Sequence, residues 1–139
     1  MWTKSHTIIT KDVTAEQMWQ LFANVNNWHT WDEGIEYATM EGKFEKGNHF
    51  ILKPKGGPKV KIELIEAIAN KRFTDLTRFP LARMYGNHLF KPTPEGLEIT
   101  TTMTVKGPLS FLWIKLVAAG IVNALPTEMI TQVKTAAQL

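Results

Sequence analysis

The most regular hydrophobic pattern in the chain lies at its C-terminal end, from Gly107 to Leu139. Apolar residues recur there at spacings of three and four, as they do in a helix that buries one face. The predicted buried stripe consists of Leu109, Leu112, Trp113, Leu116, Val117, Gly120, Ile121 and Ala124. Pro126 lacks a backbone N–H and clashes with the preceding turn, so we expect it to bend this helix or to begin a second segment.

The N-terminal part of the chain predicts a strand followed by a short helix. The stretch from Trp2 to Thr10 contains β-branched residues that are typical of a strand. Thr14 and Gln17 have the spacing of a capping box, which predicts a helix over residues 15–24. The predicted buried face of this helix consists of Met18, Leu21, Phe22 and Val25. The connection that follows, up to Glu33, predicts a turn or a single helical turn.

Residues 34 to 106 show a succession of strands separated by turn residues. The strands are predicted near 34–41, 48–54, 58–69, 72–79, 82–92 and 96–106. Their separators are rich in glycine and proline, as in the tight hairpin from Lys55 to Pro58 and the turn from Pro92 to Gly96. Apolar and polar residues alternate along 59–64 and along 97–106, so one face of the sheet is predicted to be buried. The short turns predict antiparallel pairing.

This order of elements predicts an α+β protein. A seven-stranded curved antiparallel sheet should wrap around the long C-terminal helix, with two short helices after the first strand. The 139 residues are predicted to form a single domain over 1–139. The apolar content of 44% and the charged content of 21% are those of an ordinary globular protein.

Composition narrows the chemistry that this chain can perform. It has no cysteine, which excludes disulfides and thiolate chemistry. Its histidines, His6, His29, His49 and His88, have no metal-binding spacing, so we expect no metal and no cofactor. The net charge of +3 is too small an excess to favour a nucleic acid as a partner.

The C-terminal helix is not expected to span a membrane. Ser110, Lys115 and Asn123 interrupt its apolar run, and a lysine in the middle of a membrane helix costs about 2.5–3.5 kcal/mol. The first ten residues contain no apolar segment of the kind found in signal peptides, so a cytoplasmic location is expected. The oligomeric state is left open.

Several motifs give the chain a likeness to a known family. They are the Trp28-to-Asp32 stretch with the pattern WxxWD, the KPKGGP hairpin from Lys53 to Pro58, and the GPLSFL start of the last helix at Gly107. With this element order, the chain resembles the START-related polyketide cyclase/dehydrase superfamily, also called SRPBCC. The resemblance implies a helix-grip fold whose cavity, between the sheet and the C-terminal helix, takes hydrophobic ligands. Members range from lipid and hormone binders to aromatic-ring cyclases and Hsp90-ATPase activators.

We therefore expect the protein to bind a hydrophobic or aromatic small molecule between the sheet and the C-terminal helix. Whether it also catalyses a reaction is left open. The candidate ligand-binding residues are Trp28, Trp31, Tyr37, Met84, His88, Phe90, Met103, Trp113, Leu116, Val117, Gly120 and Ile121. Ordinary core packing is the alternative interpretation of the aromatic and methionine residues among them.

A polyketide cyclase/dehydrase-type enzyme, with His88 as its acid-base group, is the alternative function. In the strand 82–92, the residues from Met84 to Phe90 at every second position are predicted to face inward, and His88 is among them. Asp75 is predicted to share a face with Thr77 on the preceding strand, from which it would orient and charge the imidazole. A one-residue change of register would place Asp75 on the other face. A histidine that is hydrogen-bonded within the sheet is the competing interpretation.

A second alternative is an interaction module that uses a basic hairpin. Lys53, Lys55, Lys59 and Lys61 would place positive charge at its tip, where phosphates, an anionic membrane or an acidic partner would be attracted. Aromatic residues are not interleaved with these lysines, as stacking on nucleic-acid bases would require. A solvated sheet edge that resists aggregation is the alternative explanation. Arg78 and Arg83 are candidates for contacting a ligand carboxylate, or are simply solvated.

Overall fold

Seven strands form one antiparallel sheet in the order β1-β7-β6-β5-β4-β3-β2 in the computed structural model, which describes residues 1–139. The strands are β1 (Trp2–Thr10), β2 (Ile35–Thr39), β3 (His49–Pro54), β4 (Val60–Ile68), β5 (Arg72–Phe79), β6 (Ala82–Thr93) and β7 (Gly96–Lys106). The helices are α1 (Ala15–Ala23), the 3₁₀ helix η1 (Val25–Thr30), α2 (Ser110–Trp113), the π-helical turn η2 (Ile114–Ala118) and α3 (Ala119–Ala136).

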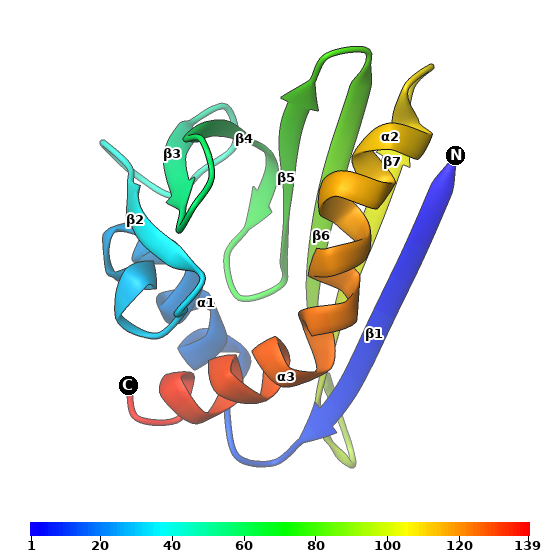
Figure 1. Cartoon of the computed structure of the whole chain (residues 1–139). Helices are drawn as coiled ribbons and strands as arrows, with labels where there is room; N and C mark the ends of the chain where they lie inside the picture. The colour runs from blue at the N-terminus through cyan, green and yellow to red at the C-terminus, as the bar shows by residue number, and fades with distance from the viewer.

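The sheet curves around the C-terminal helix, as Figure 1 shows. The segment formed by α2 and η2 lies over β6 and β7, and α3 contacts α1 and β1. The N-terminus lies at the same end of the molecule as α2, whereas the C-terminus lies beside α1 (Figure 1). This arrangement confirms the predicted α+β architecture, with its seven-stranded sheet and long C-terminal helix.

Local sequence signals explain how closely the predicted elements agree with the structure. The limits of β1, β5 and β7 are the predicted ones. The capping box at the start of α1 is present, because Thr14 Oγ1 accepts from the Gln17 N–H at 3.1 Å and Gln17 Oε1 accepts from the Thr14 N–H at 2.9 Å. The predicted inward face of α1 is buried at Met18, Leu21 and Phe22.

The predicted buried face of the C-terminal helix is only partly correct. Val117 packs against buried residues, whereas the predicted residues Leu112, Gly120 and Ala124 are exposed. A regular α-helical period leads from Trp113 to Val117 and then to Gly120 and Ile121. The π turn η2 contains one residue more than an α-helical turn. The buried stripe therefore continues through Ala118, Val122 and Leu125. Leu116 and Ile121 consequently lie on the exposed side.

Pro126 lies inside α3 and does not end it. Its ring cannot donate the hydrogen bond that the carbonyl four residues earlier would accept, which is the usual cause of a bend in a helix. Figure 1 shows the helix changing direction within α3, so that its last part reaches α1. Of the two predicted outcomes at the proline, the structure shows the bend.

The buried apolar residues form two separate clusters on the concave side of the sheet. The larger cluster lies between α1, α3 and the sheet and includes Met18, Phe73 and Met129, each 0% exposed. The smaller cluster lies toward the other end of the helix and consists of Met84, Met103, Val105 and Ala118. Val122 packs against both clusters. The interior is therefore divided along the direction of the helix.

The corrected helix face gives a stability prediction. Leu125→Ala is expected to lower the free energy of unfolding by about 2–5 kcal/mol, because Leu125 is buried although it lay outside the predicted stripe, and its truncation leaves a cavity beneath α3. Leu116→Ala should change it by less than about 0.5 kcal/mol, since the side chain of Leu116 is 62% exposed. Urea unfolding of both variants measures the two losses of stability. A larger loss for Leu116→Ala would show that the originally predicted face is the buried one.

Candidate functional site

Polar side chains occupy the concave face between the two apolar clusters. We call this group the polar belt, and it consists of His6, Asp75, Thr77, His88 and Thr101. The strand register places them together, because His6 of β1 is opposite Thr101 of β7, which is opposite His88 of β6. Directly opposite residues in a sheet share a face. Thr77 and Thr101 are buried, whereas every other buried side chain is apolar.

Asp75 and His88 come together in the belt, as the sequence predicted. Their closest atoms, Oδ2 and Nε2, are 3.6 Å apart. The pairing is diagonal, since the register places Phe73 opposite His88 and Gly86 opposite Asp75. The His88 ring stacks on Phe73 with a centroid distance of 4.3 Å. The two polar side chains remain 15% and 18% exposed, so solvent reaches both the imidazole and the carboxylate.

Gly86 provides the space that Asp75 occupies. A Cβ atom added to this glycine would lie 2.7 Å from Asp75 Oδ1, which is too close for any real contact. The absent side chain therefore allows the carboxylate to lie over the β6 backbone and to approach His88. The sequence offered no specific signal for this role, because an isolated glycine within a strand has several explanations.

Three members of the belt, Thr77, Thr101 and His6, were not predicted as site residues, although Thr77 was expected to share a face with Asp75. Thr101 had a readable signal, because it is the polar residue at an inward position of an otherwise apolar series that runs from Leu97 to Val105. His6 had none, since its position depends on the pairing of β1 with β7, and these strands lie at opposite ends of the chain.

Several predicted ligand-binding residues do lie on the concave side. Met84 and Met103 are buried in the smaller cluster, Val117 packs against it, and Phe90 belongs to the larger one. Trp113 stacks on Phe79 at a centroid distance of 4.4 Å. Its indole N–H donates to the Pro80 carbonyl at 2.9 Å, so this tryptophan joins the helix to the turn between β5 and β6.

Other predicted ligand-binding residues lie elsewhere. The π turn rotates the helix and leaves three of them exposed, namely Leu116, Gly120 and Ile121. A Cβ atom added at Gly120 would touch nothing. These residues do not form the predicted wall. Tyr37 is also exposed, because the inward residues of β2 are its buried neighbours Ile35 and Ala38.

The tryptophans of the WxxWD stretch belong mainly to the core. Trp28 is buried, and its indole N–H donates to the Phe22 carbonyl at 3.1 Å. Trp31 is half-buried and packs edge-on against Phe22. Its Nε1 atom is buried without a hydrogen-bond partner. Of the two interpretations of this stretch, core packing agrees with the position of Trp28.

The predicted basic groups lie away from the belt. Lys53 forms an ion pair with Glu36 at 2.6 Å, while Lys55, Lys59 and Lys61 are exposed. Arg78 forms an ion pair with Glu63 at 3.4 Å. Arg83 lies directly opposite Arg78 on the neighbouring strand. Both arginines alternate with inward residues and therefore point away from the concave face.

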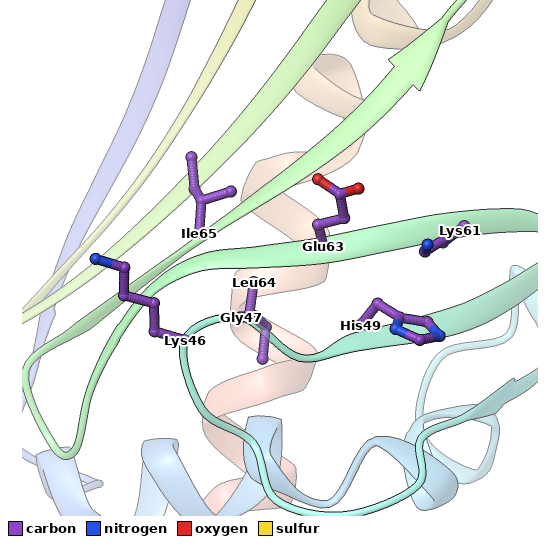
Figure 2. A pocket seen from close by; sticks show the side chains of 7 residues that line it. All are labelled: Lys46, Gly47, His49, Lys61, Glu63, Leu64 and Ile65. Atoms are coloured by element: carbon purple, nitrogen blue, oxygen red, sulfur yellow. The ribbon is translucent and has the colours of Figure 1, made fainter.

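A hollow of about 320 Å³ lies beside β3 and β4, as Figure 2 shows. Its lining residues are Lys46, Gly47, His49, Lys61, Glu63, Leu64 and Ile65. Glu63 and Ile65 extend from one side of β4 and Leu64 from the other (Figure 2). Since no belt residue lines it, this hollow is separate from the polar belt.

Carboxylates gather where the WxxWD stretch meets α3. Burial raises the pKa of the Asp32 carboxyl above its ordinary value, although the Gly34 N–H that donates to it at 2.9 Å acts in the opposite direction. Burial also raises the pKa of Glu128, and the negative charges of Asp32 and Glu33 raise it further. These groups therefore resist ionisation in the folded protein.

A curved antiparallel sheet that encloses a C-terminal helix, with polar side chains on its concave face, defines a START-like helix-grip protein. Residues 1–138 match the family described as "Polyketide cyclase / dehydrase and lipid transport". The chain therefore belongs to this family, which confirms the predicted resemblance. No curated protein matches the chain.

Solved structures show the same fold at low identity. A hypothetical protein from Helicobacter pylori is 14% identical with a TM-score of 0.76, and the alignment covers 97% of this chain and 88% of that one. A START superfamily protein from Mycobacterium smegmatis is 13% identical with a TM-score of 0.67, over 96% and 97% of the two chains. The di-domain ARO/CYC StfQ from the steffimycin biosynthetic pathway is 15% identical with a TM-score of 0.72, over 98% of this chain and 50% of that one.

The contact between Gly86 and Asp75 can be tested by a double-mutant cycle. Gly86→Ala is expected to destabilise the protein by about 1–3 kcal/mol, because the new methyl group must displace the carboxylate. In an Asp75→Ala background that obstacle is gone, so the two substitutions should be coupled by about 0.5–3 kcal/mol. Urea unfolding of the four proteins measures the coupling. Simple additivity would show that Asp75 does not lie over Gly86.

The raised pKa of Glu128 predicts a pH-dependent stability. A carboxyl whose pKa is raised by folding destabilises the folded state wherever it is ionised, and this cost disappears as the pH falls below its unfolded pKa. Glu128→Gln should therefore stabilise the protein near pH 7, by at most about 1 kcal/mol because solvent screens this half-exposed group. The gain should vanish near about pH 3. Thermal unfolding is measured across this pH range for Glu128→Gln and for the control Glu95→Gln, whose carboxylate is exposed. The prediction is contradicted if the two substitutions change the unfolding temperature with the same pH dependence.

Proposed function

We propose that this protein binds a hydrophobic or aromatic small molecule that carries a polar group, between the concave face of the sheet and the C-terminal helix. The observation that supports the proposal is the polar belt. Within the protein, its side chains have no hydrogen-bond partner, and their closest polar contact is the 3.6 Å approach of Asp75 to His88. The polar atoms of these side chains still reach solvent, since the only buried side-chain nitrogen or oxygen without a partner is Trp31 Nε1. A ligand that displaced this solvent would have to replace its hydrogen bonds, and the belt offers the donors and acceptors for that.

The surroundings of the belt define the chemistry of the ligand. The apolar clusters on either side would contact a hydrophobic body, and Val122, which touches both clusters, marks where that body would lie. Asp75 would accept a hydrogen bond from a hydroxyl group, and the imidazole of His88 and the threonine hydroxyls can donate to a carbonyl or phenol oxygen. The ligand class is therefore an amphipathic ring compound or a lipid with a small neutral polar group.

The 15% and 18% exposed fractions of His88 and Asp75 also bear on access. A polar group that was sealed inside the protein would be unavailable to a ligand. Here solvent reaches His88 and Asp75, the two side chains of the belt that can form the strongest hydrogen bonds with a ligand. The family description, which names lipid transport as well as cyclase and dehydrase activity, is consistent with a ligand at this place. The cytoplasmic location stays a prediction.

Acid-base catalysis is the second candidate function, and the proximity of Asp75 to His88 favours it. A carboxylate beside an imidazole can orient the ring, and an imidazole that is held in place suits proton removal next to a carbonyl group. A cyclase or dehydrase reaction needs such a step. Binding alone needs only the hydrogen bonds, so the two functions differ in whether the ligand leaves chemically changed.

Titration with naphthol, followed by native mass spectrometry and NMR, tests the binding proposal. We expect one molecule to bind and to shift the amide signals of the strands that contain Thr101 and His88. Val122→Trp should abolish this binding by placing an indole where the ligand would contact both clusters, whereas Ile130→Trp on the exposed side of the same helix should retain it. Thr101→Val should weaken binding by about tenfold, since one net hydrogen bond is lost.

The outcomes separate the possibilities. Shifts that are scattered over the surface, or binding that Val122→Trp leaves intact, would contradict the proposed site. For the enzyme candidate, the rate at which a β-diketone takes up deuterium from deuterated water is compared with and without the protein. A rate increase that His88→Gln abolishes without loss of binding would support catalysis, whereas a rate equal to that in buffer would leave binding alone.

A further inference from the structure

One end of the molecule combines exposed apolar side chains with cations that have no ionic partner. This surface, which we call the basic apolar end, is formed by the β5–β6 turn, the end of β7 and the first turns of the C-terminal helix. Its exposed apolar residues are Leu81, Phe111 and Leu116, with exposed fractions of 65%, 69% and 62%. Its cations are Arg83, Lys106 and Lys115, all of which are exposed and none of which forms a salt bridge.

The turn that carries Leu81 is joined to the C-terminal helix by hydrogen bonds. Leu81 has a φ of 55°, a left-handed conformation that is strained for a bulky side chain. The Leu109 N–H donates to the Leu81 carbonyl at 3.0 Å, and the Trp113 indole donates to the Pro80 carbonyl at 2.9 Å. These contacts lock the turn to the helix while they leave the side chain of Leu81 in solvent. Packing within the protein therefore does not account for the strained leucine.

The charged part of the surface is repulsive in the isolated protein. The register places Arg83 directly opposite Arg78 on one side and directly opposite Lys106 on the other. Like charges in such positions destabilise a sheet. Only Arg78 has a carboxylate partner, which is Glu63. The sequence contains no acidic residue from Leu76 to Pro94 or from Ile99 to Thr127, the segments that build this end. An anionic partner would relieve this repulsion.

We propose that the basic apolar end docks onto an anionic phospholipid surface. Such a surface offers negative phosphates to the cations and an apolar layer beneath them to the leucine and phenylalanine side chains. The first turns of the C-terminal helix supply Phe111, Lys115 and Leu116 to this contact. The later part of the helix, which contains Ile130 and Lys134, does not belong to the basic apolar end.

A second copy of the chain fits this surface less well. Two copies of the basic apolar end that face one another would bring like charges together with no carboxylate to separate them. A nucleic acid would neutralise the cations but would leave Leu81 and Leu116 without an apolar partner. The lipid surface satisfies both kinds of side chain at once.

The docking proposal is independent of the proposed function. The polar belt lies on the concave face, and none of its residues belongs to the basic apolar end. Naphthol binding can therefore be measured on every variant that is designed for the lipid test. A variant that keeps its naphthol site and its thermal unfolding transition but loses lipid binding has lost only the docking surface.

Co-sedimentation with vesicles tests the proposal, using phosphatidylglycerol mixed with phosphatidylcholine and, separately, phosphatidylcholine alone. We expect the protein to bind the anionic vesicles, with an affinity that falls as salt is added. Changing Arg83, Lys106 and Lys115 together to glutamine should weaken binding by about 100-fold, at about fivefold for each charge. The matched control changes Lys11, Lys91 and Lys134, which are exposed elsewhere, to glutamine and should bind as the native protein does.

A second pair of variants tests the apolar contribution. Leu81→Ser combined with Phe111→Ser should reduce vesicle binding at least tenfold, whereas Ile9→Ser combined with Ile130→Ser, at exposed positions outside this end, should not. The proposal is overturned if the anionic vesicles are not bound, if both charge variants bind equally well, or if neutral vesicles are bound as tightly. If the native protein is a dimer in solution and the variant with Leu81→Ser and Phe111→Ser is a monomer, this end is instead an interface between two copies of the chain.

Discussion

The structure depends on the burial of one face of a bent helix against a curved sheet. The C-terminal helix is apolar around much of its circumference, so hydrophobicity alone does not choose the face that is buried. The π turn at Ile114–Ala118 makes the choice, because its additional residue rotates the following helix until Ala118 and Leu125 face inward. The bend at Pro126 then carries Met129 to the larger cluster beside α1.

The same choice separates two kinds of surface. Residues turned toward the sheet contact the apolar clusters, between which Asp75, His88 and Thr101 form the polar belt. Residues turned away, such as Leu116, remain in solvent. Because side chains alternate across a strand, a single sheet can present a recognition site on its concave face and a repulsive row of cations on its convex face. The two surfaces are therefore available for different partners.

The candidate site was only partly predictable, because some of its contacts join residues that are close in the sequence and others join residues that are far apart in it. Asp75 and His88 were predicted to approach one another because a short hairpin joins their strands. His6 and Thr101 meet only through the pairing of β1 with β7, which joins residues that are far apart in the chain. Tyr37 and Trp28 illustrate the converse. Their aromatic character fits a ligand site, but one is exposed and the other is buried in the core.

The sequence by itself determined the order of the elements, most of their limits and the inward faces of β4, β6 and β7. These properties follow from local periodicity, turn residues and the Thr14 capping box, which act within a few residues of one another. The tertiary structure alone decided which face of the C-terminal helix is buried, how Asp75 fits over Gly86 and which strands share the polar belt. Such features depend on strand register and helix rotation, where a shift of one residue exchanges an inward side chain for an outward one.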